Sequence, residues 1–243
     1  MTLTHSLFRP LILGNGRLAQ HLEFYLTQLG LAPGMHRNSR ELPEPDTVTQ
    51  FTHLWMMVPD SALSAFAEAL WDRFPEKPLI HSSAAISVRN ALTLHPLMTF
   101  NRVQDQGYYS MESYRNTPFT VFHEELQSAP GTLEALREAI PNPIIPLRVS
   151  QRERYHLNCV MISNLSILLW DAAMRCGPEL SRTLFQPILE QTVQNFMLHG
   201  SSALTGPLAR GDHATLERHL AVLKSRPEEK LYRAFLEYYA HRT

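Results

Sequence analysis

The segment Gly14-Asn-Gly-Arg-Leu-Ala19 constrains the fold of this chain more than any other part of the sequence. It follows a short apolar run, Pro10–Leu13, and it opens the segment 17–29, in which leucines recur at helical spacing. A strand that turns into a helix through G-x-G-x-x-A is the context of a dinucleotide-binding loop. The chain has only 10 glycines, about 4% against an average of roughly 7%, so two glycines this close together indicate a specific role.

Each small residue of this loop has a physical reason. The first glycine permits the tight turn, the second lets backbone approach a pyrophosphate, and Ala19 allows the helix to pack closely on the strand. The start of the helix offers free N–H groups and a positive dipole end to phosphate oxygens. We therefore predict that the pyrophosphate is held by Gly14, Asn15, Gly16, Arg17 and Leu18. A strand–helix turn in a protein that binds no nucleotide is the alternative interpretation.

The residues about 20 positions further on favour NADP(H) over NAD(H). NAD-preferring sites place an acid there, whereas NADP sites use arginine for the 2′-phosphate. Here the stretch is His36-Arg-Asn-Ser-Arg40, and we predict that Arg37, Ser39 and Arg40 bind the 2′-phosphate. A solvated basic loop remains the alternative, because Leu31–Met35 makes a weak second strand.

Strand and helix signals alternate through the first 148 residues. Apolar runs at 53–58, 79–80, 93–94 and 119–122 predict strands, and the segments 60–74 and 131–140 predict helices. Alternation of this kind predicts an α/β fold, a doubly wound and mostly parallel Rossmann-type sheet. Ligands bind such sheets beyond the carboxyl ends of the strands, so Val58, Pro59 and Ser82 are expected along the nicotinamide.

The character of the sequence changes near residue 148. Pro141, Pro143 and Pro146 form a stiff connection that is hostile to helix, and strand signals cease after Ser150. The remainder predicts helices at about 151–175, 179–199 with an interruption at Pro187, 212–225 and 228–241. We therefore predict a dinucleotide-binding domain over 1–148 and an all-α domain over 149–243.

Composition excludes several classes of protein. The 22 Lys+Arg nearly balance the 23 Asp+Glu, which disfavours a nucleic-acid partner. Cys159 and Cys176 have no spacing typical of disulfide scaffolds or zinc sites, and the 12 histidines show no metal-ligand spacing, so no metal is expected. No signal peptide is apparent, and the most apolar stretch is broken by polar residues, so no membrane partner is expected. The prediction is a soluble, cytoplasmic protein.

Taken together, the motifs resemble a family of Rossmann-type oxidoreductase-like proteins of unknown function. The resemblance covers nearly the whole chain, and its carriers are Gly14–Ala19, Val58–Asp60, His81–Ala84, Leu94–Phe100, Tyr155-His156 with Ser163-Asn164, and Ala203–Asp212. These proteins are related to ketopantoate reductase and pyrroline-carboxylate reductase. The resemblance implies a Rossmann domain, a C-terminal helical domain like that of 6-phosphogluconate dehydrogenase, and an active cleft between the two.

One departure from the related enzymes bears on catalysis. They often carry Lys-x-x-x-Asn at the start of the first helix of the C-terminal domain, where this chain has Arg154-x-x-x-Asn158. Arginine stays protonated, so Arg154 can orient a carboxylate or stabilise an oxyanion but is a poor proton donor.

The long helix predicted from 151 carries a polar stripe that includes His156 and lies opposite Leu157, Met161 and Leu165. A helix this apolar is expected to be buried, so its polar stripe should line a polar cavity. We assign His156 as the candidate proton donor and Asn164 as a residue that orients the substrate. A structural histidine is the alternative for His156.

Three further residues are candidates for contact with a substrate: His95, Arg154 and Arg210. His95 follows a strand where ligands bind such sheets, although the sequence His95-Pro96 can also simply form a turn. Arg210 follows the Gly206-Pro207 turn and can bind an acidic group, while Asp212 is suited to cap the next helix.

The sequence thus predicts an NADP(H)-dependent oxidoreductase that acts on a small, carboxylate-bearing substrate and forms a homodimer through its helical domain. A dinucleotide-binding sensor or scaffold without turnover is one alternative, favoured by the missing lysine. A purely structural dimer that binds no cofactor is another, which the intact glycine loop disfavours.

Overall fold

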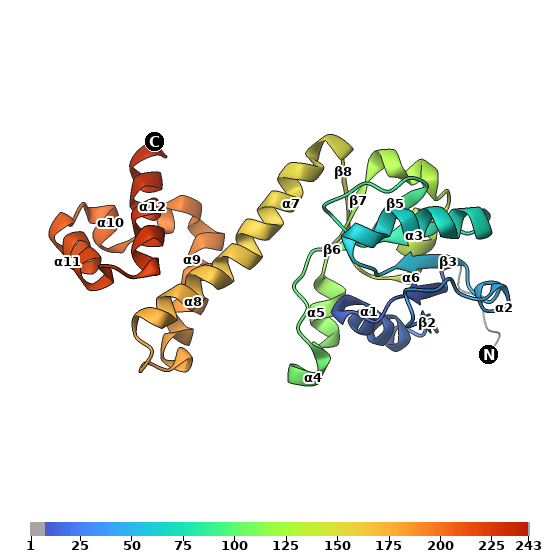
Figure 1. Ribbon diagram of the computed structural model, residues 1–243, viewed down its shortest axis with the longest axis horizontal. Helices are drawn as coiled ribbons and strands as arrows, with labels where there is room; N and C mark the ends of the chain where they lie inside the picture. Colours follow the sequence, from blue (N-terminus) through green and yellow to red (C-terminus); the bar gives the residue numbers. More distant parts are fainter. Residues whose placement is uncertain (1–7, 243) are drawn as a thin grey trace. The chain divides into compact units, whose positions relative to one another are not determined.

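The computed structural model describes residues 8–242 of the 243-residue chain (Figure 1). The chain divides into two compact units, which separate between Val160 and Met161. We call residues up to Val160 the sheet unit and those from Met161 the helical unit, and describe each by itself.

The sheet unit contains a five-stranded, wholly parallel sheet with the strand order β2-β1-β3-β4-β5. Its strands are β1 (Pro10–Leu13), β2 (Gly34–His36), β3 (His53–Met56), β4 (Leu79–His81) and β5 (Ala91–Thr93). The chain steps from β1 to β2 on one side and then returns to place β3 on the other side of β1. This reversal is the topological switch point of a doubly wound fold, which confirms the predicted fold class.

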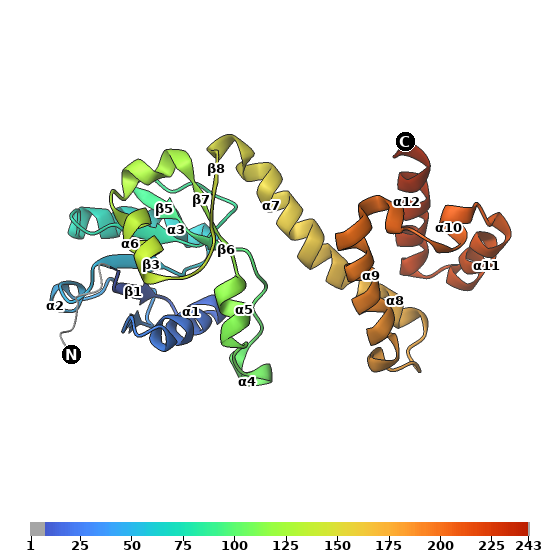
Figure 2. The ribbon, with the colours of Figure 1, turned by 180° about the vertical axis from the view of Figure 1, so that it is seen from behind.

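Alternate residues of the central strands face opposite layers, because successive side chains of a strand point to opposite faces. Ile12 and Trp55 pack with α1 (Arg17–Gln28) and α6 (Thr132–Ala139), whereas Leu54 packs with α3 (Asp60–Arg73) and α2 (Pro45–Val48). In Figures 1 and 2 these helices can be followed around the sheet. Both faces are therefore covered, as the apolar runs predict.

A second, three-stranded sheet has the order β6-β7-β8 and comprises β6 (His95–Pro96), β7 (Phe119–Phe122) and β8 (Ile144–Leu147). β7 pairs antiparallel with β6 and parallel with β8. The sequence did not predict β8, because it contains Pro146, which pairs opposite Val121. Proline is tolerated there because β8 is an edge strand. Of the strand predicted at 93–94, Thr93 ends β5, whereas Leu94 lies between β5 and β6. The short helices α4 (Val103–Gln106) and α5 (Met111–Asn116) lie between β6 and β7 in the chain.

The segment after β8 is helical, as predicted. A single 3₁₀ turn leads into α7 (Arg152–Val160), a π-helical turn (Met161–Leu165) and α8 (Ser166–Cys176). The remaining helices are α9 (Gln186–His199), α10 (Gly206–Arg210), α11 (His213–Leu223) and α12 (Pro227–His241). Pro187 lies in the first turn of α9 and does not interrupt it, since the first turn needs no N–H from that position. The residues before α9 form a 3₁₀ turn, Arg182–Phe185.

The predicted domain boundary at 148/149 coincides with the end of β8, but α7 groups with the sheet unit. The reason is a buried ion pair, since Arg152 in the first turn of α7 contacts Glu125. Asp212 accepts a hydrogen bond from the Thr215 backbone N–H at 3.1 Å and so caps α11, as predicted.

Candidate functional site

The glycine loop lies at the switch point of the parallel sheet. Gly14 has a φ of +141°, and its N–H donates to the carbonyl of His36 at the end of β2, at 2.9 Å. A Cβ at this position would lie 2.4 Å from the carbonyl oxygen of Met57, which follows β3. Glycine is therefore required here by the packing of three strand ends, with no need to invoke a ligand.

Gly16 differs from Gly14 in what surrounds it. Its φ is −71°, an ordinary value, and a Cβ added there would meet no atom within 4 Å. Gly16 also precedes α1, whose first turn receives no side-chain cap. Protein packing therefore does not explain this glycine, whereas a ligand lying against the uncapped helix start would.

A cavity of about 550 Å³ lies over this loop. Its walls come from the loop, from the segment after β2, from the end of β3 with the start of α3, and from the segment after β4. The predicted cofactor residues on its wall are Asn15, Gly16, Arg17, Leu18, Arg37, Ser39, Val58, Pro59 and Ser82. The fold thus brings together nearly all of the predicted cofactor residues, although they come from four separate stretches of sequence.

Arg37 follows β2 directly, at the strand end where the fingerprint places the residue that recognises the ribose. Its guanidinium donates to the Asn15 side chain at 2.7 Å and pairs with Glu23 of α1 at 3.0 Å. Ser39 lines the cavity beside it, whereas Arg40 is exposed and is not among the lining residues. The carboxylate of Glu23 is a partner of Arg37 that the sequence analysis missed.

Ser82 lies at the carboxyl end of β4, but its hydroxyl is already engaged. It accepts from the indole N–H of Trp55 at 2.9 Å and donates to the carbonyl of Leu94 at 3.0 Å. These bonds fix the loop after β4 at the edge of the cavity, beside Val58 and Pro59. Ser82 therefore shapes this end of the cavity and has no free hydroxyl proton to offer a ligand.

His95 and Tyr155 form a hydrogen-bonded pair in the sheet unit. His95 Nδ1 lies 2.7 Å from the Tyr155 hydroxyl, which donates to Thr120 Oγ1 at 2.9 Å. Burial, with a smaller contribution from nearby His156, lowers the pKa of His95 to about 4. Burial raises the pKa of Tyr155 to about 12. At neutral pH the imidazole is therefore uncharged and the phenol keeps its proton.

The side chain of Tyr155 also borders a cavity of about 520 Å³ at the start of α7. Arg154 and Asn158 line the same cavity, together with Leu147, Ser150 and Gln151. The Arg-x-x-x-Asn pattern thus places both of its polar side chains on one cavity, one helical turn apart. His156, predicted as the proton donor, is half-buried on the same helix and is not among these lining residues.

Asn164 and Arg210 belong to the helical unit, and both are exposed. Asn164 lies in the π-helical turn Met161–Leu165, where its side-chain oxygen accepts from Ser163 Oγ at 2.7 Å. Turns of this type are frequent at functional sites. Arg210 is the last residue of α10. Their roles stay predictions.

A buried polar cluster at the base of α7 was missed by sequence reasoning. Arg152 donates to the Glu125 carboxylate at 2.5 Å and to the carbonyl of Ile86 at 2.8 Å, and its guanidinium lies 3.7 Å from the centre of the Phe122 ring. Glu125 also accepts from the Thr93 backbone N–H at 3.0 Å. The first residue of the predicted polar stripe, Arg152, is therefore buried in an ion pair and does not line a cavity. The partner carboxylate lies 27 positions away, so no local pattern could reveal it.

His81 lies beside this cluster and is fully buried at the end of β4. Its Nε2 contacts Thr93 Oγ1 at 3.1 Å, while its Nδ1 has no hydrogen-bond partner. Burial, aided by the charge of Arg152, lowers the pKa of His81 to about 3, so the ring is neutral. Within residues 8–242, no cluster of histidine, cysteine or carboxylate side chains is suited to hold a metal ion.

Comparison with known proteins places the second half of the chain in a family. Residues 119–238 match the family model described as "Domain of unknown function (DUF2520)". The chain carries a DUF2520 domain. This region runs from β7 into α12, so it includes β7 and β8 of the second sheet, Tyr155 and the whole of α7. No curated protein matches the sequence.

Solved structures of similar fold align with nearly the whole chain. A candidate NADP oxidoreductase from Bacteroides fragilis is 20% identical, with a TM-score of 0.73 over 98% of this chain and 99% of the other. The protein TM1727 from Thermotoga maritima is 19% identical, with a TM-score of 0.66 over 95% and 96%. An imine reductase from Streptomyces aurantiacus is 12% identical, with a TM-score of 0.60 over 96% and 93%. At these identities the likeness establishes the Rossmann-like fold with its helical C-terminal region.

One helical stretch, Val149–Cys176, is long and apolar enough to cross a membrane when judged by length and composition alone. The buried core helix of a soluble protein meets the same criterion, and so the finding is weak evidence for a membrane. None of its apolar window is buried here. This contradicts the expectation that the long helix is buried within its own chain: Leu157, Met161 and Leu165 are about half exposed.

Proposed function

We propose that this DUF2520 protein is an NADP(H)-dependent oxidoreductase that transfers hydride to or from a small, carboxylate-bearing substrate. One observation carries the proposal: Gly16 lines the cavity over the glycine loop, and a Cβ added at Gly16 would meet no protein atom within 4 Å. A glycine that packing does not require is explained by backbone that must approach a ligand. Two proteins of similar fold, a candidate NADP oxidoreductase and an imine reductase, support the same class of reaction.

The cavity walls fit a dinucleotide. The N–H groups at the start of α1, from Arg17 onward, would bind the pyrophosphate, and Arg37 with Ser39 would bind the 2′-phosphate. Val58, Pro59 and the loop fixed by Ser82 would lie along the nicotinamide. The nicotinamide supplies or accepts hydride when bound.

The protein must supply a proton and hold the substrate. His156 and Asn164 remain the residues proposed from sequence, and the geometry adds Tyr155 as a residue that would position the substrate. The Tyr155 hydroxyl donates to Thr120 and is held by His95, so it would shape the cavity and not supply the proton. Arg154, on the same cavity as Tyr155, would orient a substrate carboxylate. The location of this chemistry in a cleft between the two domains stays a prediction, as does a cytoplasmic location.

A dinucleotide-binding sensor without turnover is the second candidate. It is favoured by Arg154, which stands where the related enzymes often carry a lysine able to donate a proton. Cofactor binding does not separate the two functions, whereas turnover does. A panel of keto acids and cyclic imines, followed by NADPH oxidation, would identify an enzyme and its substrate class.

The proposal is tested first at Gly16. Gly16→Val is expected to weaken NADPH binding at least tenfold without changing the melting temperature, since an added Cβ meets no protein atom within 4 Å and the side chain would occupy part of the cavity. Fluorescence titration with NADPH and thermal unfolding measure the two quantities. Gly14→Ala is the contrasting variant and should lower the melting temperature, because its Cβ meets the Met57 carbonyl. Unchanged NADPH affinity in a folded Gly16→Val variant would show that the loop is only a turn.

Cofactor preference is tested at Arg37. Arg37→Ala is expected to weaken NADPH binding about 10- to 100-fold, with little effect on NADH, because a charge-assisted bond to phosphate contributes about 1.5–3 kcal/mol. Arg40→Ala is the matched control and should have a smaller effect, since Arg40 is not on the cavity wall. Glu23→Gln should tighten NADPH binding, because the carboxylate competes with phosphate for Arg37. Equal binding of NADPH and NADH by the unaltered protein would reject the 2′-phosphate assignment.

A further inference from the structure

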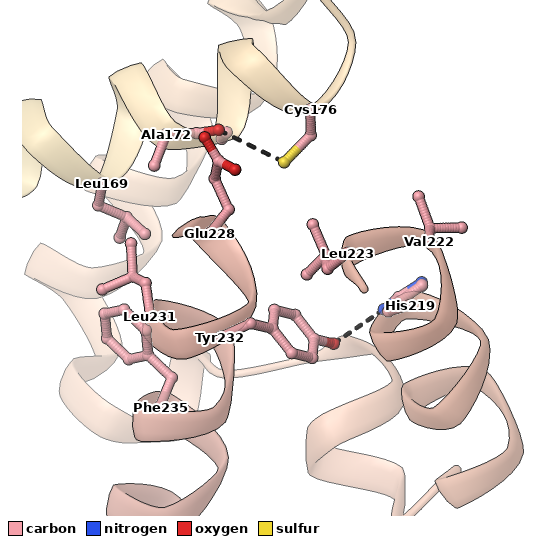
Figure 3. A pocket seen from close by; sticks show the side chains of 11 residues that line it. Leu169, Ala172, Cys176, His219, Val222, Leu223, Glu228, Leu231, Tyr232 and Phe235 are labelled. Carbon is pink, nitrogen blue, oxygen red and sulfur yellow. Dashed lines mark hydrogen bonds between the residues drawn. The ribbon is translucent and has the colours of Figure 1, made fainter. Parts of the chain in front are cut away.

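An apolar groove of about 350 Å³ lies in the helical unit, between α8, α11 and α12 (Figure 3). Leu169 and Ala172 line it from α8, Val222 lines it from α11, and Leu231 with Phe235 line it from α12. All of its lining residues belong to the helical unit, and none of them lines the cofactor cavity. A volume of this size falls within the range of pockets that hold small organic molecules.

The walls of the groove suit the apolar part of a ligand. Leu231 and Phe235 are one helical turn apart on α12, so their side chains lie on the same face of that helix. Both are more than a third exposed, and a ligand in the groove would remove apolar surface from water. On the α8 wall, Ala172 and Ala173 have short side chains that leave room between the helices.

Most of the polar groups on the wall already have partners. His219 Nδ1 lies 2.8 Å from the Tyr232 hydroxyl, and the two rings meet edge to face. Burial raises the pKa of Tyr232, so the phenol keeps its proton at neutral pH and can donate it to the imidazole. The thiol of Cys176 donates to the carbonyl of Ala172 within α8, at 3.4 Å. These groups need no hydrogen bond from a ligand.

One carboxylate oxygen on the wall differs from them. Glu228 lies in the first turn of α12, and its side chain is only 12% exposed. Its Oε2 is buried and has no hydrogen-bond partner among residues 8–242. In Figure 3 this side chain points from the start of α12 toward α8, at the end of the groove nearest Ala172 and Cys176. A buried carboxylate oxygen normally has a donor, because burial removes its hydration.

Arg226 does not supply this donor. Its Nε lies 3.5 Å from Glu228 Oε2, an ion pair whose geometry makes no hydrogen bond, and its Nη2 donates to the carbonyl of Arg175. The Arg226 side chain is also partly exposed, so water and salt screen its charge. The buried carboxylate oxygen can therefore accept a hydrogen bond from a cationic donor on the groove side.

We propose that the groove binds a small apolar amine, whose ammonium group donates to Glu228 and whose apolar body lies between α8, α11 and α12. A hydrogen bond from an ammonium group to a carboxylate is charge-assisted and stronger than one from a neutral donor. The rings of Tyr232 and Phe235, on the same wall, also favour a cation over a neutral head group. An anionic head group would be repelled by the Glu228 carboxylate.

An apolar surface of another protein chain fits the groove less well. It would close the groove and leave Glu228 Oε2 buried without a donor. The cores of protein interfaces are also depleted in charged residues, whereas this groove contains a buried carboxylate. A small molecule that carries its own cationic donor satisfies both the apolar walls and the carboxylate.

Three probes with the same alkyl chain test the head group: n-octylammonium, 1-octanol and octanoate. Isothermal titration calorimetry of the full chain at neutral pH measures their affinities. We expect the dissociation constant of n-octylammonium to be about tenfold lower than that of 1-octanol, and octanoate to bind more weakly than either. Equal affinities for n-octylammonium and 1-octanol would overturn the proposal, and so would an absence of n-octylammonium binding.

Glu228→Gln locates the site, because the amide keeps the shape of the side chain and loses its charge. It should weaken n-octylammonium binding about tenfold and change 1-octanol binding less than about twofold. Glu229→Gln is the matched control, since Glu229 is in the same helical turn, pairs with Arg233 at 2.9 Å and does not line the groove. It should leave both affinities unchanged. A folded Glu228→Gln variant with full affinity for n-octylammonium would overturn the proposal.

Hydrogen exchange of the unaltered chain covers the case in which Glu228→Gln does not fold. Saturating n-octylammonium should slow the exchange of amides in α8, α11 and α12 and leave those of the sheet unit unchanged. Protection confined to other helices would overturn the assignment. The affinity should also be independent of protein concentration. Affinity that falls as the protein concentration rises would show that another chain fills the groove, which would overturn the proposal too.

These measurements are independent of the proposed function, because the groove and the cofactor cavity share no lining residue. A protein that binds NADPH but not n-octylammonium would reject this inference alone. A protein that binds n-octylammonium through Glu228 but fails to bind NADPH would reject the proposed function alone.

Discussion

The two units of this protein differ in how they bury their apolar residues. In the sheet unit, alternate residues of β1 and β3 face two separate apolar layers, and both layers are closed by helices of the same unit. In the helical unit, two leucines are buried among the described residues, and α8 is exposed on nearly every side. With comparable apolar content, the sheet unit buries its apolar residues in its own core, whereas the helical unit leaves many of its apolar residues exposed.

The polar groups differ in the same way. The sheet unit buries Glu125 with Arg152 and encloses neutral His53 and His81. The ion pairs of the helical unit, such as Glu229 with Arg233, lie on helix surfaces within one turn. A buried polar group must be satisfied by the fold that encloses it, so the sheet unit is specified by its own tertiary contacts. The two predictions that follow challenge this contrast, the larger effect first.

Removal of one partner of the buried ion pair should destabilise the sheet unit strongly. Glu125→Gln leaves the Arg152 guanidinium buried without its counter-charge, which costs about 3–5 kcal/mol of the free energy of unfolding. Urea denaturation measures the change, and the double variant with Arg152→Met should recover much of it. The matched control in the helical unit is Glu229→Gln, which should have little effect because that pair is at the surface. Equal effects of the two substitutions would remove the distinction between the units.

Acid should destabilise the sheet unit through its buried histidines. Burial lowers the pKa of His53 to about 4 and that of His81 to about 3, from 6.5 in the unfolded chain. Below pH 6.5 these histidines bind protons in the unfolded chain, whereas in the folded unit they stay neutral. Their contribution to the free energy of unfolding is therefore complete above pH 6.5 and falls as the pH drops toward 4. Each histidine contributes at most about 1.4 kcal/mol per pH unit.

The variant His53→Gln should remove the part of this pH dependence that is due to His53. His53 contacts Thr52 and Thr132, and a glutamine retains groups able to bond both hydroxyls. Urea unfolding at neutral pH and at about pH 5 measures the slope, with hydrogen exchange resolving the sheet unit from the helical unit. An unaltered slope in this variant would mean that His53 binds protons equally in the folded and the unfolded protein, against the expected effect of its burial.

Much of the cofactor half of the site was predictable, because it depends on local sequence. The strand, the turn and the helix around Gly14 are contiguous, and Arg37 could be located by its distance along the chain. The structure confirms the parallel sheet, and it places Arg37 and Ser39 on the cavity wall. The NADP preference itself stays a proposal.

The cavity at the start of α7, proposed to bind the substrate, was less predictable, because it depends on contacts between distant segments. Tyr155 was noted as part of a motif, but its bonds to His95 and Thr120 span 60 and 35 positions. The strand β8 was hidden by its prolines, which local rules assign to a connection, although an edge strand accepts them. The long helix was expected to be buried, and in this chain it is not.

The sequence alone determined the alternation of strands and helices in the first half of the chain, the position of the glycine loop and the change to an all-helical region, because these follow from periodicity and from short turns. Tertiary structure decided which glycine serves packing and which leaves room for a ligand, since only the neighbours of Gly14 and Gly16 distinguish them. It also decided that Glu125 pairs with Arg152 and that the apolar side chains of α8 are exposed. Burial and pairing depend on which distant segments meet, and no local pattern records that.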